Sequence, residues 1–189
     1  MLFHRFAVVA LVSSGLTLLA PAQTSPAAAA GNCAQSASRP WAPVKTRAYR
    51  VEAFSNGPTC SLAVVTLVVR APNGKVLWVD AAQTDQLMTF VEAKSRKQMA
   101  RALTEWLFQS HGFKSTADLP EWKKGADAPA SGEFPFYPEA DIDRDAYEKI
   151  RGEMHPVFCY VQGMESMTCL GLSTMDGSLS KIGVQLFPG

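Results

Sequence analysis

The chain lacks most of the short motifs that identify enzymes. GxSxG, GxGxxG, GxxxxGK and CxxC are absent, and the three histidines show neither HxxxH nor HxH spacing. These absences disfavour a nucleophile elbow, a phosphate-binding glycine loop, a thiol redox pair and a zinc site. A triad built from distant residues, such as Asp80 or His111 with a serine, leaves no such spacing. A secreted hydrolase with dispersed catalytic residues is therefore the alternative that we retain.

An excess of one charge and long apolar runs are also missing. After residue 22 no stretch approaches the roughly 20 apolar residues that a membrane-spanning helix requires. Lysine and arginine number 18, aspartate and glutamate 17, and Arg5 is the only basic one of these within the first 22 residues. The rest of the chain is neutral, which argues against nucleic acid as a partner.

The N-terminus carries the pattern of an export signal. Arg5 precedes an apolar run, and Ala20-Pro21-Ala22 supplies the small residues that a signal peptidase recognises. We expect residues 1–22 to be a signal peptide, with cleavage after Ala30 or lipidation of Cys33 as alternatives. The protein is then periplasmic or, alternatively, secreted. Residues 23–43 are rich in Ala, Ser and Pro, and we expect a flexible leader before one α+β domain over residues 44–189.

Four cysteines in an exported chain indicate two disulfides. Cys159 and Cys169 flank a hairpin loop and would lie directly opposite each other if the hairpin is centred on Met164. Cys33 and Cys60 are then left to pair, which would tie the leader to the sheet.

Strand-like segments occupy both ends of the expected domain. Leu62–Val69 is nearly continuously apolar, so we expect a central strand that is covered on both faces. A turn at Pro72-Asn73-Gly74 connects this strand to its expected partner, Val76–Val79. A three-residue loop at Met175-Asp176-Gly177 connects the cysteine hairpin to the last strand. The other expected strands are Val44–Phe54, Val76–Val79, Val157–Val161, Met167–Leu172 and Leu179–Phe187.

Helical spacing predicts one long and one short helix. Thr84–His111 carries an apolar stripe, with Thr84 or Asp85 as its cap, and Asp143–Met154 is the short helix. We expect an α+β fold in which an antiparallel sheet of about five or six strands packs on the long helix. The loop at Met175-Asp176-Gly177 would place Leu170 opposite Ile182 and Thr168 opposite Val184. The face that contacts the long helix would then be shared by Phe158, Tyr160, Leu170, Leu172, Ile182, Val184 and Leu186.

Acidic residues before the short helix alternate as they do in a calcium loop. Asp141, Asp143 and Asp145 fit that spacing, but the sixth and twelfth positions hold Ala146 and Gly152 instead of Gly and Glu. We therefore expect helix capping at this point, and no metal or cofactor.

Two features are candidates for binding a partner. Residues 115–140 form a long Pro/Gly-rich loop whose aromatic residues could present a stiff apolar surface. Its candidate residues are Trp122, Phe134, Phe136 and Tyr137. On the long helix, the wheel places Phe90 beside Lys94, Lys97 and Arg101, where it could meet an anionic or aromatic partner. For both features we weigh the alternative that the rings serve packing alone.

The sequence thus predicts an exported, non-enzymatic binding or inhibitor module. Its partner would be an envelope or extracellular protein, and no pattern assigns an oligomeric state.

Overall fold

The computed structural model describes residues 32–44, 47–108, 113–129 and 133–187. Within these residues the strands form two antiparallel sheets of four. The first sheet has the order β1 (Gln35–Val44), β2 (Arg47–Asn56), β3 (Val64–Arg70) and β4 (Val76–Gln83). The second has the order β5 (Phe136–Pro138), β8 (Leu179–Leu186), β7 (Ser166–Leu172) and β6 (Val157–Val161). The helices are α1 (Arg96–Phe108) and α2 (Arg144–Gly152), and the short 3-10 helices include η2 (Thr84–Gln86), η3 (Met88–Phe90) and η4 (Thr116–Asp118).

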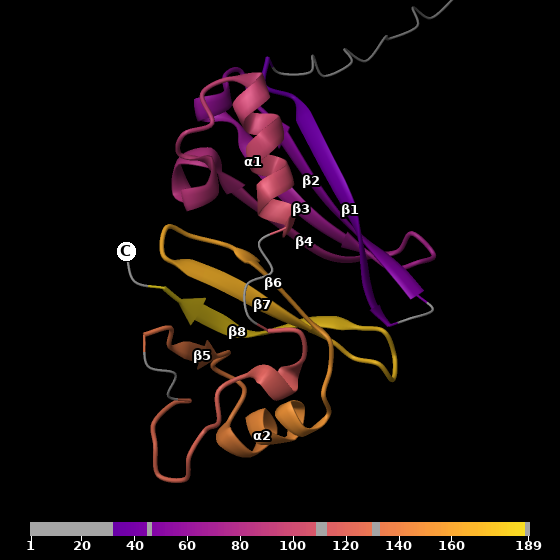
Figure 1. Cartoon of the computed structure of the whole chain (residues 1–189), viewed down its shortest axis with the longest axis vertical. Coiled ribbons are helices and arrows are strands. Elements are labelled where there is room, and N and C mark those ends of the chain that lie inside the picture. Colours follow the sequence, from indigo (N-terminus) through magenta and orange to yellow (C-terminus); the bar gives the residue numbers. More distant parts are fainter. Residues whose placement is uncertain (1–31, 45–46, 109–112, 130–132, 188–189) are drawn as a thin grey trace, which may run out of the picture.

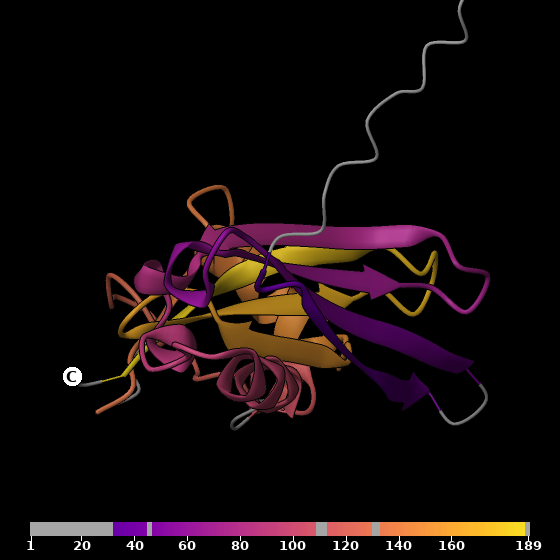
Figure 2. The same ribbon diagram turned by 90° about the horizontal axis from the view of Figure 1, so that it is seen from above.

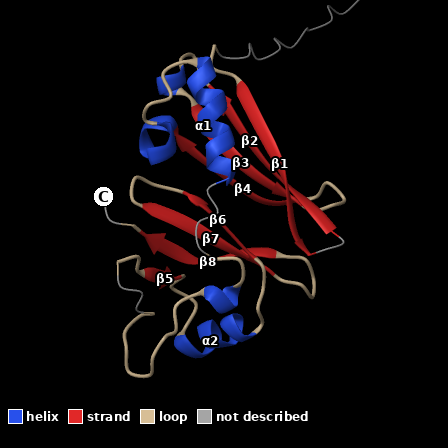
Figure 3. Ribbon diagram, viewed as in Figure 1, coloured by secondary structure: helices blue, strands red, loops and turns tan. Residues whose placement is uncertain are grey.

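The two sheets form successive layers (Figure 1), with α1 on the same face of the first sheet as the second sheet and α2 beyond the second sheet. Helix α1 packs on β1 and β2, and α2 packs against η4 at the opposite end of the molecule (Figure 3). Seen from above, the strands of the first sheet lie over those of the second (Figure 2). The α+β fold with a long helix, a short helix and antiparallel strands is confirmed, but the strands are divided between two sheets.

The first sheet alternates between a buried and an exposed face. Val51, Val65 and Leu67 are fully buried on the face toward α1 and the second sheet. Phe54 and Val64 point the other way and are 40% and 45% exposed. A strand presents successive residues to opposite faces, so β3 is central but covered on one face only. The expectation of cover on both faces for this strand is wrong.

The second sheet is enclosed on both faces. Every residue of β6 is buried, and so is every residue of β7 except Ser166. Trp41 contacts Phe158 from the side of the first sheet, with ring centroids 5.4 Å apart. On the other face Phe136 contacts Tyr147 of α2 at 6.1 Å. This sheet is therefore the middle layer of the molecule.

Both predicted disulfides are present, and each is explained by its surroundings. Cys159 and Cys169 are direct cross-strand partners in the β6–β7 hairpin, as the centred loop predicted. Cys33 pairs with Cys60 and joins the chain just before β1 to the turn before β3. Ser55 Oγ donates to the Cys33 carbonyl at 2.8 Å and holds this start of the chain in place.

The chain pairs with the sheet earlier than predicted. Strand β1 covers Gln35–Val44, which lies almost entirely in the expected flexible leader. It pairs along β2 from Gln35 opposite Ser55 to Val44 opposite Arg47. Its two prolines are tolerated because β1 is an edge strand. The expected signal peptide lies outside the described residues.

The long helix begins later than predicted. Thr84 is buried and donates its hydroxyl to the Cys60 carbonyl, so it caps no long helix. The side chains of Gln83 and Gln86 close a capping box around η2, and a second cap forms where Ser95 Oγ accepts from the Gln98 N–H at 3.3 Å. Two short 3-10 turns therefore replace the first part of the expected helix. Its expected end, His111, lies outside the described residues.

The last hairpin differs from the predicted register by a bulge. Thr168 lies opposite Val184 as predicted, but Leu170 lies opposite Lys181 instead of Ile182. The register shifts between Cys169 and Leu170, and one extra residue of β8 is accommodated there. The face with Phe158 and Tyr160 contacts the first sheet, and α1 adds mainly Trp106 to it. The expected contact of this face with the long helix is thus present through Trp106, and the first sheet also contacts the face.

Candidate functional site

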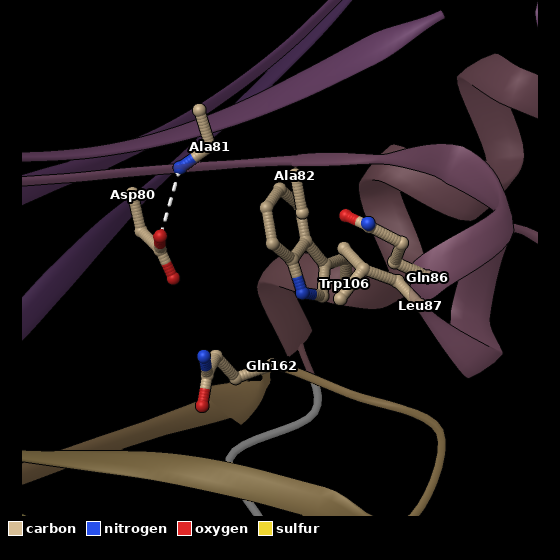
Figure 4. Close-up of a pocket in the computed structure, with 7 residues that line it drawn as sticks. All are labelled: Asp80, Ala81, Ala82, Gln86, Leu87, Trp106 and Gln162. Atoms are coloured by element: carbon tan, nitrogen blue, oxygen red, sulfur yellow. Dashed lines mark hydrogen bonds between the residues drawn. The ribbon is translucent and has the colours of Figure 1, made fainter. Parts of the chain in front are cut away.

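A pocket of about 160 Å³ lies where the two sheets and α1 meet (Figure 4). One wall of the pocket comes from strand β4, and a second comes from η2 and Leu87, which follows it. Helix α1 forms the floor, and the β6–β7 hairpin forms the wall opposite β4. The lining residues are Asp80, Ala81, Ala82, Gln86, Leu87, Trp106 and Gln162.

Asp80 is held in this pocket by a hydrogen-bonded chain that crosses between the sheets. In β4 it pairs with buried Leu67, so it belongs to the inner face of the first sheet. The Tyr160 hydroxyl donates to Asp80 Oδ2 at 2.8 Å, and the Trp78 indole N–H donates to that hydroxyl at 2.9 Å. The Ala81 N–H donates to Asp80 Oδ1 at 2.8 Å. Each carboxylate oxygen therefore has one donor and a free lone pair.

In this series of hydrogen bonds, the hydroxyl of Tyr160 is a neutral donor. Its side chain is fully buried. Burial raises the pKa of the Tyr160 hydroxyl above its ordinary value, and the neighbouring Asp80 charge raises it further. The proton therefore stays on the phenol, and the negative charge stays on Asp80.

The indole of Trp106 and the amide of Gln162 complete the pocket. Trp106 Nε1 donates to the Val161 carbonyl at 2.7 Å, which fixes the ring against the edge of β6. Thr168 Oγ1 donates to Gln162 Oε1 at 3.0 Å. Asp80 and Gln162 point toward one another across the pocket (Figure 4). The Met88 N–H donates to the Gly163 carbonyl at 3.3 Å, so η3 and the hairpin meet beside the pocket.

The ionisable group in the lining of this pocket is the carboxylate of Asp80. Its seven lining residues include no hydroxyl, thiol, imidazole or amine side chain. Among the described residues no basic side chain forms an ion pair with Asp80. Sequence analysis named Asp80 only as one member of an undefined triad, and it did not connect it with Tyr160, which is 80 residues away.

The predicted aromatic loop does not form one exposed surface. Phe136 is fully buried, with its ring edge-on to Phe113 at 5.9 Å. Trp122 is half-buried against Tyr147, and its indole N–H donates to the Ala126 carbonyl at 2.8 Å. Phe134 and Tyr137 remain 44% and 48% exposed. The packing alternative is thus correct for Phe136, because residues 136–138 pair with β8 as strand β5.

The basic helix face does not contain the predicted aromatic ring. Phe90 is 1% exposed and packs edge-on against Trp106 at 5.1 Å, so its placement beside the cations is wrong. The reason is that Phe90 belongs to η3 and not to the helix on which the wheel placed it. Lys94 and Lys97 are exposed, and exposed Arg101 pairs with Glu105 at 2.7 Å.

No group of three potential metal ligands occurs in the part of the chain that the structure describes. His155 Nε2 lies 2.8 Å from Glu153 Oε2. Asp143 accepts from the Ala146 N–H and caps α2, in agreement with the capping interpretation of the acidic residues.

One catalytic spacing escaped the sequence analysis, namely Ser-x-x-Lys at Ser178 to Lys181. On a helix this spacing places both side chains on one face. Here the two residues lie at the start of strand β8, where this spacing does not bring their side chains to one face. Ser178 Oγ donates to Asp176 at 2.8 Å, and Lys181 pairs with Glu139 at 2.9 Å. The two side chains have separate partners, so they form no Ser–Lys pair.

The outer face of the first sheet is the second candidate surface, and we call it the open face. It consists of Phe54 on β2, Val64, Thr66 and Val68 on β3, and Val79 and Ala81 on β4, which the strand register places side by side. Val79 is 55% exposed, whereas Val68 between its neighbours is 7% exposed.

No helix in the described ranges is long and apolar enough to cross a membrane. The chain matches no protein-family model, no curated protein and no solved structure.

Proposed function

We propose that this protein is an exported, non-enzymatic binding module that docks an envelope or extracellular protein on its open face. The observation that carries the proposal is the mismatch in β3. Its sequence has the nearly continuous apolar character of a strand covered on both faces, yet its outer side carries Val64 at 45% exposure. A partner that covers this side would bury the outer side chains of β3, as the apolar sequence of the strand favours.

The composition of the open face favours a protein surface as the occupant. Phe54, Val64 and Val79 come from three adjacent strands, so their exposed side chains form one patch instead of isolated positions. Contiguous apolar patches on a folded protein commonly mark interaction sites, whereas single exposed apolar residues do not. None of the described pockets opens among these residues, so the patch is suited to a broad surface.

Charge at one end of the open face defines the partner further. Arg50 is paired across β2 and β3 with Arg70, and Lys75 lies in the adjoining turn. Glu52 is the acidic residue among them, and it pairs with Arg70 at 2.8 Å and with Arg50 at 3.8 Å. Asp176 lines a pocket together with Lys75, so three cations stand against two carboxylates and this end keeps an excess of one positive charge. We therefore propose a partner with an apolar patch that is bordered on one side by acidic residues.

Two further observations support the proposal, the first on export and the second on binding. Both disulfides are formed, and disulfides persist chiefly in oxidising compartments such as the periplasm and the cell exterior. No hydroxyl, thiol, imidazole or amine side chain lines the pocket beside Asp80, and the side chains of Ser178, Lys181 and His155 have other partners. A binding role thus has a surface to act through, whereas a hydrolase has no assembled site among the described residues.

The test is site-specific photocrosslinking in the exporting cell. A photoreactive residue at position 79 on the open face is compared with one at exposed Thr104 on α1. We expect one heterologous protein to crosslink from position 79 only, and Phe54→Ser to remove the product while the melting temperature stays within about 2 °C. With the captured protein purified, affinity should fall with salt, and the Arg50→Gln and Lys75→Gln variants should reduce that dependence.

Other outcomes would overturn the proposal. A crosslink to a second copy of this chain would make the open face a self-association surface. Equal crosslinking from positions 79 and 104, or binding that is insensitive to Phe54→Ser, would remove the open face as the docking site. Turnover of ester or glycan substrates that disappears in His111→Ala or His155→Ala would establish the hydrolase alternative.

A further inference from the structure

We infer that the pocket between the two sheets binds a primary ammonium group, as carried by a small aliphatic amine or by a lysine side chain. The inference concerns a different surface from the open face and does not rest on the proposed function. It rests on three features of the pocket: an uncompensated carboxylate, an indole wall, and a hydrogen-bonded frame that holds both in place.

The carboxylate supplies the charge that an ammonium requires. Asp80 accepts one hydrogen bond on each oxygen, from Tyr160 and from the Ala81 N–H, and both oxygens keep a second acceptor position. Its donors are neutral, and no basic side chain among the described residues pairs with it. A cationic donor that entered the pocket would therefore neutralise this charge with charge-assisted hydrogen bonds.

The remaining walls favour an organic cation with a short apolar stem. Trp106 contributes an aromatic ring, which attracts a cation electrostatically. Ala82 and Leu87 add apolar surface for methylene groups beside the ring (Figure 4). A pocket of about 160 Å³ has room for several water-sized groups, which suits an ammonium head and its adjoining methylenes. An anion would be repelled by Asp80, and a neutral alcohol would leave the charge uncompensated.

The frame makes the pocket preorganised. Trp78 and Tyr160 fix the position of Asp80, and the hydrogen bond to the Val161 carbonyl fixes Trp106. Thr168 fixes Gln162. Binding then requires little ordering of side chains, which is the condition under which a small ligand retains measurable affinity.

The experiment follows the indole N–H signals of Trp106 and Trp78 by NMR while n-butylammonium is added at constant ionic strength. n-Butanol and butyrate serve as neutral and anionic ligands of the same length. We expect saturable shifts of the Trp106 signal with n-butylammonium alone, with a millimolar Kd. Asp80→Asn, which keeps an acceptor for Tyr160, should weaken binding at least tenfold, whereas the control Asp141→Asn on the far side of the molecule should not.

A second arm compares n-butylammonium with a lysine capped at both backbone ends. Tighter binding of the capped lysine assigns the pocket to a protein side chain, and tighter binding of the free amine assigns it to a small amine. Equal shifts with n-butanol, or unchanged affinity in Asp80→Asn, would overturn the inference. If Asp80→Asn fails to fold, the comparison of n-butylammonium with n-butanol on the wild-type protein decides it.

Discussion

The two sheets of this protein have four strands each but differ in how they are covered. The second sheet lies between the first sheet and α2, and its strands β6 and β7 are buried on both faces. The first sheet has α1 and the second sheet on one face and solvent on the other. Apolar sequence alone does not distinguish them, because the nearly continuously apolar β3 belongs to the sheet that is half open.

The difference shows that strand burial depends on what the rest of the chain supplies. Residues after β4 supply two covers: α1 with η3 for the first sheet, and α2 with η4 for the second. On the open face Phe54, Val64 and Val79 stay accessible to solvent, whereas Val68 between them is buried. The predictions below test this contrast, from the largest expected effect to the smallest.

Two adjacent aromatic residues test how completely the second sheet is covered. Phe136 is fully buried and Tyr137 is 48% exposed, although both lie in β5. Phe136→Ala should reduce the free energy of unfolding by about 3–5 kcal/mol, because it opens a cavity between β8 and α2. Tyr137→Ala should change it by less than about 0.5 kcal/mol. Denaturant unfolding of both variants measures this, and equal losses would contradict the layered arrangement.

The two disulfides allow the halves of the molecule to be compared directly. Cys33–Cys60 spans 27 residues in the first half, and Cys159–Cys169 spans 10 in the second. Loop closure entropy predicts losses of about 3.5 and about 2.7 kcal/mol when each pair is replaced by alanine. Chemical denaturation of the two double variants gives these values. A larger loss for the hairpin disulfide would indicate that native contacts, not loop length, set its contribution.

Neighbouring valines in β3 test whether the first sheet is covered on one face. Val65 is fully buried and Val64 is 45% exposed. Val65→Ala should cost about 2 kcal/mol because it leaves a cavity toward α1 and the second sheet. Val64→Ala should cost less than about 0.5 kcal/mol in the isolated protein. Should both variants lose similar stability, the open face is already covered in solution.

The contact between the sheets can be tested with two Tyr→Phe variants. Tyr160→Phe removes the hydroxyl that links Trp78 to Asp80, so both groups lose a hydrogen-bond partner. We expect a loss of about 1–3 kcal/mol. Tyr49 is also buried, but no hydrogen bond of its hydroxyl occurs among the described residues, so Tyr49→Phe is the matched control with little effect. Identical melting curves for the two variants would show that the link contributes nothing to stability.

Much of the local structure followed from the sequence because it depends on neighbours along the chain. The turn at Gly74, with a φ of 86°, and the loop at Gly177, with a φ of 72°, form where glycine permits left-handed backbone. The hairpin places Cys159 opposite Cys169 because a centred loop determines the register. The remaining disulfide then followed by elimination.

The incorrect predictions concern residues whose structure depends on contacts with segments that are distant in the sequence. Phe90 fits a helical wheel, but it packs on Trp106 because the extended backbone of Leu87 ends η2 and separates it from η3. The segment Gln35–Val44 resembles a linker in composition, yet the disulfide at Cys33 places it beside β2, where its backbone groups pair.

The sequence by itself determined the disulfides, the turns and most strand positions, because each depends on a few adjacent residues. Only the tertiary structure decided that the strands divide into two sheets, that Phe136 is buried, and that one face of β3 stays open. It alone also brings Asp80 to Tyr160 and Trp106 to Gln162. A pocket between two sheets has no sequence signal, because its members share no spacing and meet only when separate layers pack together.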